Sequence, residues 1–296
     1  MLNVLGIGDN VCDIYLHSGI MYPGGQALNI AVYAAMLGAK SGYIGVFGTD
    51  AVADHVAVTL DKIGVDRSRC RRCTGENGYA RVKLIDGDRV FMGSNRGGVL
   101  RQHPIQLEED DETYISGFDL VHTSNNSYFD DQLPQLRKLP VKVSYDFSGR
   151  WVEEDRLEKV CPYIDFGFLS CGSVPQEQAL KVCKRLHEKG CGVVVATMGS
   201  KGALLYDGKV CLFQPPDLVE AIDTLGAGDS FATGFLLEML RMEKSSEKQW
   251  ETDRKGAYLK ALKAGAAFAA KSCMTQGAFG YGIPVPKSIA DRLSEE

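Results

Sequence analysis

The sequence has no hydrophobic run approaching the roughly 18 residues needed to span a membrane, and its charges are not gathered into blocks of one sign. Its 38 acidic and 33 basic residues give a formal net charge of −5, unlike the basic footprint of a nucleic-acid-binding protein. The opening residues, MLNVLGIGDN, lack the basic and apolar regions of an export signal. We therefore expect no membrane and no nucleic-acid partner, a cytoplasmic location, and a small molecule as the ligand.

Cysteine is too sparse for a disulfide scaffold, with nine residues in a chain of 296, and the number is odd. Reduced thiols are the better interpretation. The C-x-x-C motif from Cys70 to Cys73 has neither a second cysteine pair nor a neighbouring histidine cluster to complete four zinc ligands. A structural role is therefore favoured for these two cysteines, with a metal or redox role as the alternative.

Two familiar phosphate-binding motifs are also missing. The pattern G-x-x-x-x-G-K-[ST] does not occur, which excludes a P-loop nucleotide hydrolase by motif. The stretch GIGDN, residues 6–10, is an incomplete dinucleotide fingerprint, because an aspartate stands where a Rossmann turn needs small residues. Any phosphate chemistry must therefore rest on a different loop.

The pattern that is present alternates strands with helices. A short apolar run at 2–8 predicts a buried strand, and residues 24–38 and 50–64 have helical spacing on either side of a strand at 41–48. Such β-α-β-α order is typical of a parallel sheet. Between 77 and 98 two alternating runs flank Asp86-Gly87, which predicts a hairpin. We expect one doubly wound α/β domain with a small β insertion.

The stretch DTLGAGDSFATGFL, residues 223–236, combines small residues, an acid and an apolar helix. Gly226, Ala227 and Gly228 leave their amides accessible at a helix N-terminus, which attracts phosphate oxygens. A carboxylate at Asp229 would repel phosphate, and proton abstraction from an attacking hydroxyl is a reason to place it there. The alternative is that Asp229 caps the helix and the glycines form a turn. Spacing alone does not decide between the two.

Two further clusters favour a ligand site. Thr197, Gly199 and Gly202 form T-x-G-x-x-G at the end of an apolar strand, where open α/β sheets carry their ligand loops. Early strand-helix junctions carry a second set of polar side chains beside two glycines, which suits a polyhydroxylated ligand, although capping would explain each residue singly. This set consists of Asp9, Asp13 and Asn29 with Gly24 and Gly25.

Together these motifs resemble a known family. DTLGAGDSFATGFL resembles the second signature of the ribokinase-like (PfkB) carbohydrate kinases, and GGQALNIAVYAAMLGAKSGYIGVFGTD resembles the first, in the family's order. The resemblance implies a mostly parallel central sheet flanked by helices, with a small β-sheet lid. It implies a single domain over 1–296, lid strands from about 10–22 and 77–98, and a homodimer that pairs through the lid.

The resemblance also implies residue roles for phosphoryl transfer from ATP. Asp229 would be the general base, and the amides of Gly226, Ala227 and Gly228 would form the anion hole together with its own amide. Gly228 would also contact the nucleotide. The nucleotide loop would be Thr197, Gly199 and Gly202, and residues 264–277 would line the adenine pocket.

Asp9, Gly25 and Asn29 match sugar-binding positions of the family, and Asp13 is a further candidate. Asp223 falls where some members bind a monovalent cation such as K⁺.

One motif departs from the family. Members commonly carry N-x-x-E to organise Mg²⁺, but here the stretch is SCGSVPQE, with Ser170 and Ser173 at the Asn and Glu positions. Glu177 is left as a displaced candidate, acting through water. Mg²⁺ itself is still expected, because nucleotide phosphates need a bridging cation.

The segments DRVF, DLVH, YDFSGRW and DTLGAGDSF are most similar to members that phosphorylate fructoselysine on its 6-hydroxyl. That substrate carries a secondary ammonium and a carboxylate, and the lid supplies Arg81, Arg89 and Arg96 while the early loops supply Asp9 and Asp13. A solvated sheet face would equally explain the arginines. The alternatives are a kinase of fructose, ribose or 2-keto-3-deoxygluconate, and a non-catalytic ligand sensor on the same fold.

Overall fold

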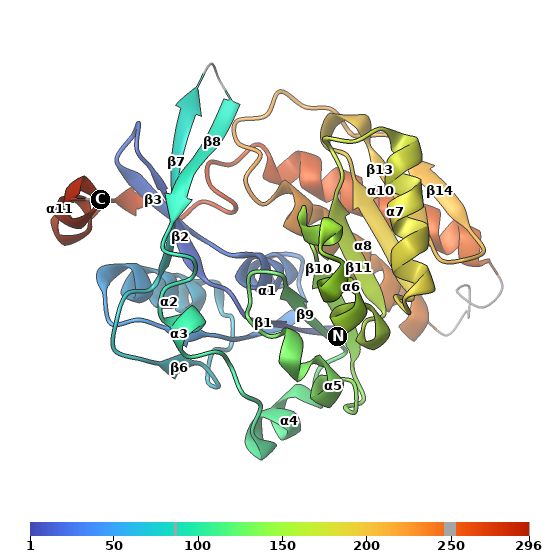
Figure 1. Cartoon of the computed structure of the whole chain (residues 1–296), viewed down its shortest axis with the longest axis horizontal. Coiled ribbons are helices and arrows are strands. Elements are labelled where there is room, and N and C mark those ends of the chain that lie inside the picture. The colour runs from blue at the N-terminus through green and yellow to red at the C-terminus, as the bar shows by residue number, and fades with distance from the viewer. Residues whose placement is uncertain (86–87, 246–252, 296) are drawn as a thin grey trace.

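A computed structural model describes residues 1–85, 88–245 and 253–295, and its centre is an eight-stranded sheet (Figure 1). Strand pairs from β12 to β4 are parallel, and β13 and β14 extend the sheet antiparallel. In spatial order the strands are β14 (Cys211–Gln214), β13 (Ala203–Tyr206), β12 (Val193–Thr197), β11 (Phe166–Ser170), β10 (Lys142–Asp146), β9 (Leu120–Ser124), β1 (Asn3–Ile7) and β4 (Lys40–Ile44).

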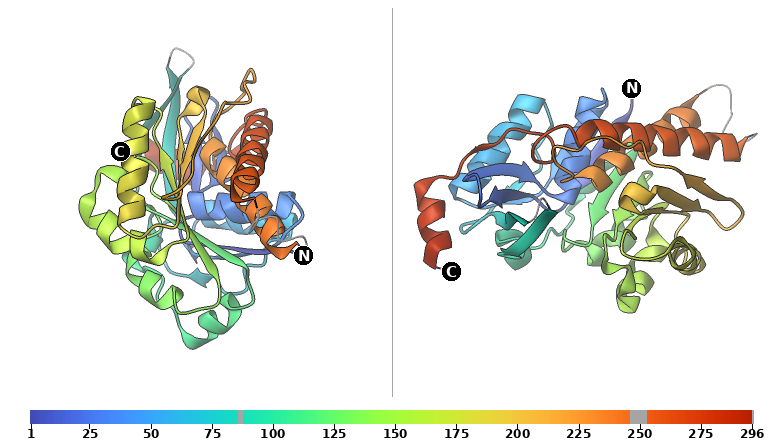
Figure 2. Two further views of the ribbon diagram at one scale, coloured as in Figure 1. Left: turned by 90° about the vertical axis from the view of Figure 1, so that its right-hand side faces the viewer. Right: turned by 90° about the horizontal axis from the view of Figure 1, so that it is seen from above.

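Helices cover both faces of this sheet, as the turned view in Figure 2 shows. One face packs against α1 (Gln26–Met36), α8 (Ala227–Lys244) and α10 (Arg254–Ser272). The other packs against α4 (Glu109–Ile115), α5 (Leu133–Leu136), α6 (Glu154–Val160) and α7 (Gln176–Glu188). Strands buried on both sides need apolar residues throughout, which explains runs such as VVVAT in β12. The expected α/β fold class is confirmed.

A second, five-stranded sheet projects from one end of the large sheet (Figure 1). Its order is β15 (Ile283–Pro284), β3 (Ile20–Gly24), β2 (Val11–Tyr15), β7 (Gly78–Ile85) and β8 (Asp88–Ser94). We call this sheet the lid. Four of its strands come from the two expected segments, whereas β15 comes from the other end of the chain and had no sequence signal. The expected turn at Asp86-Gly87 lies outside the described residues.

The lid rests on α2 (Ala51–Ile63), whose ends follow local rules. Asp50 accepts a hydrogen bond from the Ala53 amide, and Gly64 ends the helix at a φ of 85°. A two-stranded pair, β5 (Val46–Phe47) with β6 (Arg71–Arg72), and the short α3 (Val99–Gln102) complete this region. Among the described residues, no helix combines the length and hydrophobicity that a bilayer crossing requires.

The C-terminal segment connects the two sheets. After α10 the chain returns to the lid, adds β15 beside β3, and ends in α11 (Lys287–Glu295), which lies at the far side of the lid in Figure 1. Asp223, just before α8, accepts hydrogen bonds from the Tyr15 hydroxyl on β2 and from the Gly277 amide. The lid is therefore tied to the loop that precedes α8.

Candidate active site

Of the small residues at the start of α8, Gly226 is the one that the backbone geometry requires. Gly226 is the N-cap and adopts a φ of 72°, and a Cβ there would lie 2.6 Å from the Tyr33 hydroxyl. Gly228 differs, because a Cβ there would meet no atom within 4 Å. The first amides of a helix have no partner inside it, so this turn presents donors and partial positive charge to open space. The expected helix start is confirmed.

Asp229 does not cap α8. No side chain caps the helix at Gly226, and the Asp229 carboxylate instead accepts a 2.6 Å hydrogen bond from the Asn29 amide nitrogen on α1. Asp229 is buried, with only 7% of the residue exposed. This contact joins residues 200 positions apart in the sequence. Asp229 is therefore a buried carboxylate that is hydrogen-bonded to α1, and the capping alternative is wrong.

The surroundings of Asp229 disfavour its charge. Burial raises the pKa of its carboxyl well above the usual aspartate range, the nearby carboxylates of Asp146, Asp9 and Asp13 raise it further, and the hydrogen bond from Asn29 opposes them. Asp146, at the end of β10, is itself raised to a pKa of about 6, mainly by burial. A buried carboxyl with an elevated pKa holds a proton more strongly than an exposed one, which suits a proton acceptor.

Two cavities meet at this turn. The first, of about 360 Å³, is bordered by Ala227 and Gly228, and the second, of about 750 Å³, is bordered by Gly226 and Asp229. The amides and the carboxylate therefore lie between two separate spaces. Groups bound in the two cavities would therefore both lie beside the first turn of α8.

The first cavity contains the T-x-G-x-x-G residues Thr197, Gly199 and Gly202. Small residues of α10 form its opposite wall, from Ala266 to Cys273, within the segment expected to line an adenine pocket. The wall leaves room for a flat apolar group, since none of these side chains extends far from the backbone.

The second cavity brings together the candidate residues of the early loops. Its lining includes Asp9, Asp13, Gly25, Asn29 and, from the lid, Arg96. Asp9, Asp13 and Asn29 are buried, with at most 6% of each residue exposed. The carboxamide oxygen of Asn29 is buried without a hydrogen-bond partner among the described residues. A buried acceptor facing a polar cavity is available to a ligand hydroxyl.

Asp9 caps a helix, as the capping alternative allowed, but the helix is α1, which begins 17 positions later in the chain. Its carboxylate accepts hydrogen bonds from the amides of Gln26 (2.7 Å) and Ala27 (3.2 Å), so it caps α1 from a distant loop. The hydroxyls of Ser124 and Ser127 also donate to it. The neighbouring Gly25 adopts a φ of 119°, and a Cβ there would lie 2.6 Å from the Asp9 carbonyl oxygen. Asp9 thus orders the cavity wall as well as bordering the cavity.

Several lining residues were missed in the sequence. Arg101 on α3 and Arg150, in the turn after β10, both border the second cavity, together with Gln26, Asn126 and Tyr128. Polar residues at or just after the carboxyl ends of the parallel strands could have identified them, because ligands of open α/β sheets bind at that edge. The stretch YDFSGRW, which includes the end of β10 and Arg150, carries this signal.

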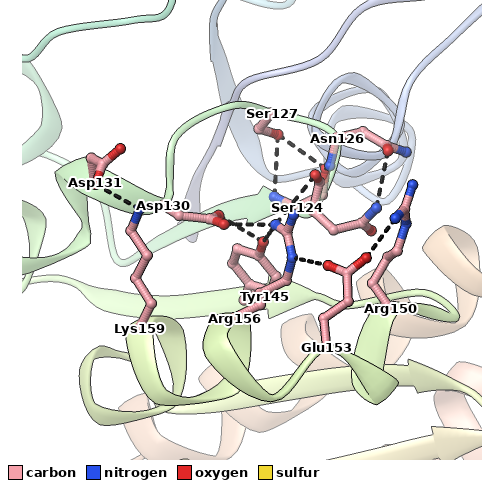
Figure 3. Close-up of polar contacts among 11 residues, drawn as sticks. Ser124, Asn126, Ser127, Asp130, Asp131, Tyr145, Arg150, Glu153, Arg156 and Lys159 are labelled. Carbon is pink, nitrogen blue, oxygen red and sulfur yellow. Dashed lines mark hydrogen bonds and ion pairs between the residues drawn. The ribbon is translucent and has the colours of Figure 1, made fainter. Parts of the chain in front are cut away.

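A polar network supports the turn that carries Arg150 (Figure 3). Arg150 pairs with Glu153, and Glu153 pairs with Arg156 at 2.9 Å. Arg156 in turn contacts Asp130 at 2.6 Å and the Tyr145 hydroxyl at 2.9 Å. The chain of contacts runs from Tyr145 on β10 through Arg156 and Glu153 to Arg150, so Arg150 is held by a partly buried network.

Four other sequence candidates lie elsewhere. The Glu177 side chain is 81% exposed and pairs with Lys181 at 2.8 Å, and it borders neither of the two cavities. Asp223 is tied to Tyr15 and Gly277, as described above. Arg81 lies across Gly93 on the lid and does not border the second cavity. The side chain of Arg89 is outside the described residues.

The C-x-x-C cysteines have packing contacts. The Cys70 thiol donates to the Tyr43 carbonyl oxygen, and burial raises its pKa to about 12, while Cys73 packs against the core. Within the described ranges, no three His, Cys, Asp or Glu side chains come together as a metal-binding group.

Comparison with known proteins agrees with this geometry. The chain is 40% identical over 284 residues to the fructosamine kinase FrlD of Bacillus subtilis (strain 168), which covers 96% of this chain and 95% of that protein. It is 34% identical over 236 residues to the fructoselysine 6-kinase of Escherichia coli (strain K12), covering 80% and 88%.

The fold also matches solved structures. Arabidopsis thaliana ribokinase complexed with ribose and ATP superposes with a TM-score of 0.75 at 21% identity, over 99% of this chain and 98% of that one. Residues 3–141 and 164–284 match the pfkB family of carbohydrate kinases. The resemblance drawn from the two signatures is confirmed, and the chain belongs to the pfkB carbohydrate kinase family.

Proposed function

We propose that the protein is an ATP-dependent kinase that phosphorylates the 6-hydroxyl of a fructosamine such as fructoselysine. The observation that carries this proposal is the meeting of two cavities at the first turn of α8, with Asp229 on one side and open amides on the other. The 40% identical relative is a fructosamine kinase, which favours this acceptor over a plain sugar.

In the proposed reaction Asp229 accepts the proton of the attacking hydroxyl. Asn29 orients its carboxylate through the 2.6 Å hydrogen bond, and its buried position keeps competing water away. The amides of Gly226, Ala227 and Gly228 stabilise negative charge on the phosphoryl group in flight. The open space at Gly228 allows a phosphate oxygen to approach the backbone closely.

The nucleotide would occupy the cavity of about 360 Å³. Thr197, Gly199 and Gly202 border the side that faces the phosphates, and the small residues of α10 leave a slot for adenine. The acceptor would occupy the cavity of about 750 Å³, with its reacting hydroxyl beside Asp229. Asp9, Asp13, Gly25 and Asn29 border the same cavity, and its carboxylates favour a positively charged substrate, such as one with a secondary ammonium.

Closure of the lid would complete the site. The lid residue Arg96 borders the acceptor cavity, so movement of the lid would change access to Asp229. Excluding water protects the phosphoryl donor from hydrolysis.

Mg²⁺ is part of this proposal, as the ion that neutralises the nucleotide's phosphate charge when bound. Mg²⁺ is commonly held by one or two carboxylates, phosphate oxygens and water, so it does not need a protein cage. Because Glu177 is exposed and paired with Lys181, we infer that the phosphates and water supply most of the ligands.

A monovalent cation such as K⁺ would bind at Asp223 only in competition with protein donors. The amides of Leu225 and Gly277 and the Tyr15 hydroxyl already donate to its two oxygens. Those contacts make a cation a poor fit here, and we propose that Asp223 acts mainly to fasten the lid to the α8 loop.

We further propose a homodimer that pairs through the lid and a cytoplasmic location. The edge strand β8 exposes Phe91 (60%) and Met92 (42%), an apolar edge that a second copy would cover. The cysteines are free thiols, most of them buried, which suits a reducing compartment.

A coupled assay of ATP consumption tests the proposed function. Fructoselysine, fructose, ribose and 2-keto-3-deoxygluconate are compared at equal concentrations, with a no-acceptor control for ATP hydrolysis. Preference for fructoselysine supports the proposal, and preference for a simpler sugar sinks the fructosamine assignment. Absence of turnover with all four would return the chain to the ligand-sensor alternative.

A further inference from the structure

The acceptor cavity is larger than a sugar alone requires. At about 750 Å³ it exceeds the nucleotide-side cavity of about 360 Å³, although a hexose has fewer atoms than a nucleotide. The surplus space lies in a cavity whose lining carries both acidic and basic side chains, so the sugar's substituent has charged surroundings of its own.

The two kinds of charge lie at different depths. The acids Asp9, Asp13 and Asp229 are buried, at 5%, 6% and 7% exposure. The three arginines that border the cavity are exposed to solvent. Arg96 and Arg101 are exposed residues, and the Arg150 side chain is 60% exposed. The acids therefore form the floor beside the reacting end, and the arginines form the mouth.

Two of the mouth arginines have guanidinium groups with no partner among the described residues. Within the described residues, the guanidinium groups of Arg96 and Arg101 make no hydrogen bond or ion pair, whereas Arg150 is paired with Glu153. Unpaired guanidinium groups that converge on one opening attract an anion, and their planar forks match a carboxylate.

The segments around Arg96 and Arg150 contain residues in uncommon backbone conformations. Arg96 and Tyr128 both have a positive φ, at 55° and 51°, and the Tyr128 hydroxyl donates to the Arg96 carbonyl oxygen at 2.7 Å. Ser148, two residues before Arg150, has a φ of 50°. Non-glycine residues in this region persist where the surroundings fix them, and ligand clamps are a common place for them.

We propose that Arg96 and Arg101, with Arg150 beside them, bind the carboxylate of the amino-acid part of the substrate. The inference rests on the proposed fructosamine kinase function and names its specificity determinant. The sugar lies over the acidic floor with its hydroxyl at Asp229, and the amino-acid chain reaches out to the mouth. The enzyme then selects glycated amino acids with a free carboxylate over neutral or amine-terminated fructosamines.

The test compares fructoselysine with its decarboxylated analogue, in which pentane-1,5-diamine carries the same fructosyl group on one nitrogen. The two acceptors share the sugar and the secondary ammonium and differ in the carboxylate. We expect kcat/KM of the wild type to be about 10- to 100-fold higher for fructoselysine, mainly through KM, as for hydrogen bonds to charged groups. In Arg96→Ala and Arg101→Ala the ratio between the two acceptors falls toward one.

A matched control is Lys138→Ala, which removes one positive charge from an exposed position outside both cavities and should leave the ratio unchanged. Arg101→Lys keeps the charge but not the fork, so an intermediate ratio is expected. Equal kcat/KM for both acceptors in the wild type, or equal losses for both in the arginine variants, would overturn the proposal. Turnover of neither acceptor would instead refute the proposed function, and preference for fructose 1-phosphate would assign the arginines to a phosphate.

Discussion

The two cavities that meet at α8 are lined by different kinds of residue. The smaller is lined chiefly by small and apolar residues, with Asp217 as its one charged lining residue among those described. The larger is lined by buried carboxylates and exposed guanidiniums. A binding site of small residues selects by shape, and one of charged residues selects by chemical group. This contrast between the two linings fits the proposed ligands: the smaller cavity would hold the nucleotide, which is common to the family, and the larger would hold the acceptor, which varies within it.

The largest effect should come from Asp229→Asn. Removing the proton acceptor should lower kcat by about 10²- to 10⁴-fold, because this is the usual contribution of general base catalysis. ATP binding, measured by calorimetry, should persist because the smaller cavity is not lined by Asp229. Near-normal turnover of the variant would remove Asp229 from the mechanism.

Gly228→Ala tests the boundary between the cavities. The added methyl meets no protein atom, and alanine favours a helix over glycine, so the melting temperature should not fall. Activity should drop by roughly 10²-fold, because the methyl occupies the approach of the phosphoryl group and small misplacements are costly. Gly226→Ala is the contrasting variant and should lose stability, since its φ of 72° and the Tyr33 hydroxyl both oppose a side chain. Full activity of Gly228→Ala would mean that the phosphoryl group passes elsewhere.

Asn29→Leu tests how the buried surroundings of Asp229 set its pKa, through the pH dependence of activity. The Asn29 hydrogen bond lowers the pKa of Asp229, so its loss raises that pKa further and leaves less ionised base at neutral pH. The acid limb of kcat/KM should move to higher pH, with partial recovery of activity in alkaline buffer. An unmoved limb would show that the titrating group is not Asp229.

The smallest effect concerns stability. The pKa of Asp229 is raised in the folded state, so ionising it costs folding free energy as pH rises above the ordinary aspartate range. Asp229→Asn should therefore melt at a higher temperature than the wild type at about pH 8, and the difference should shrink toward about pH 4. Calorimetric scans across this range check the sign. A variant that is less stable at high pH would contradict the electrostatic account of the site.

Local patterns predicted the elements well. The start of α8 at the small residues and the Asp50 cap of α2 follow from short-range rules, and the structure has them where expected. The lid strands were anticipated in outline, but β15 was not, because a two-residue strand is defined by its partner β3 and has no pattern of its own. The sequence allows Asp9 to be a ligand group or a cap but does not identify the capped helix, because the contact with α1 spans 17 positions and no local motif encodes it.

The sequence by itself determined the family, the alternation of strands and helices, and the acid that follows the small residues of α8, because these depend on spacing along the chain. The tertiary structure alone decided that Asp229 meets Asn29, that its charge is opposed by buried carboxylates, and that Arg96, Arg101 and Arg150 border one cavity. The burial of these carboxylates and the position of the arginines around one cavity depend on contacts between residues distant in the sequence. The number of charged groups could be read from the letters, but which of them lie deep and which lie at the opening could not.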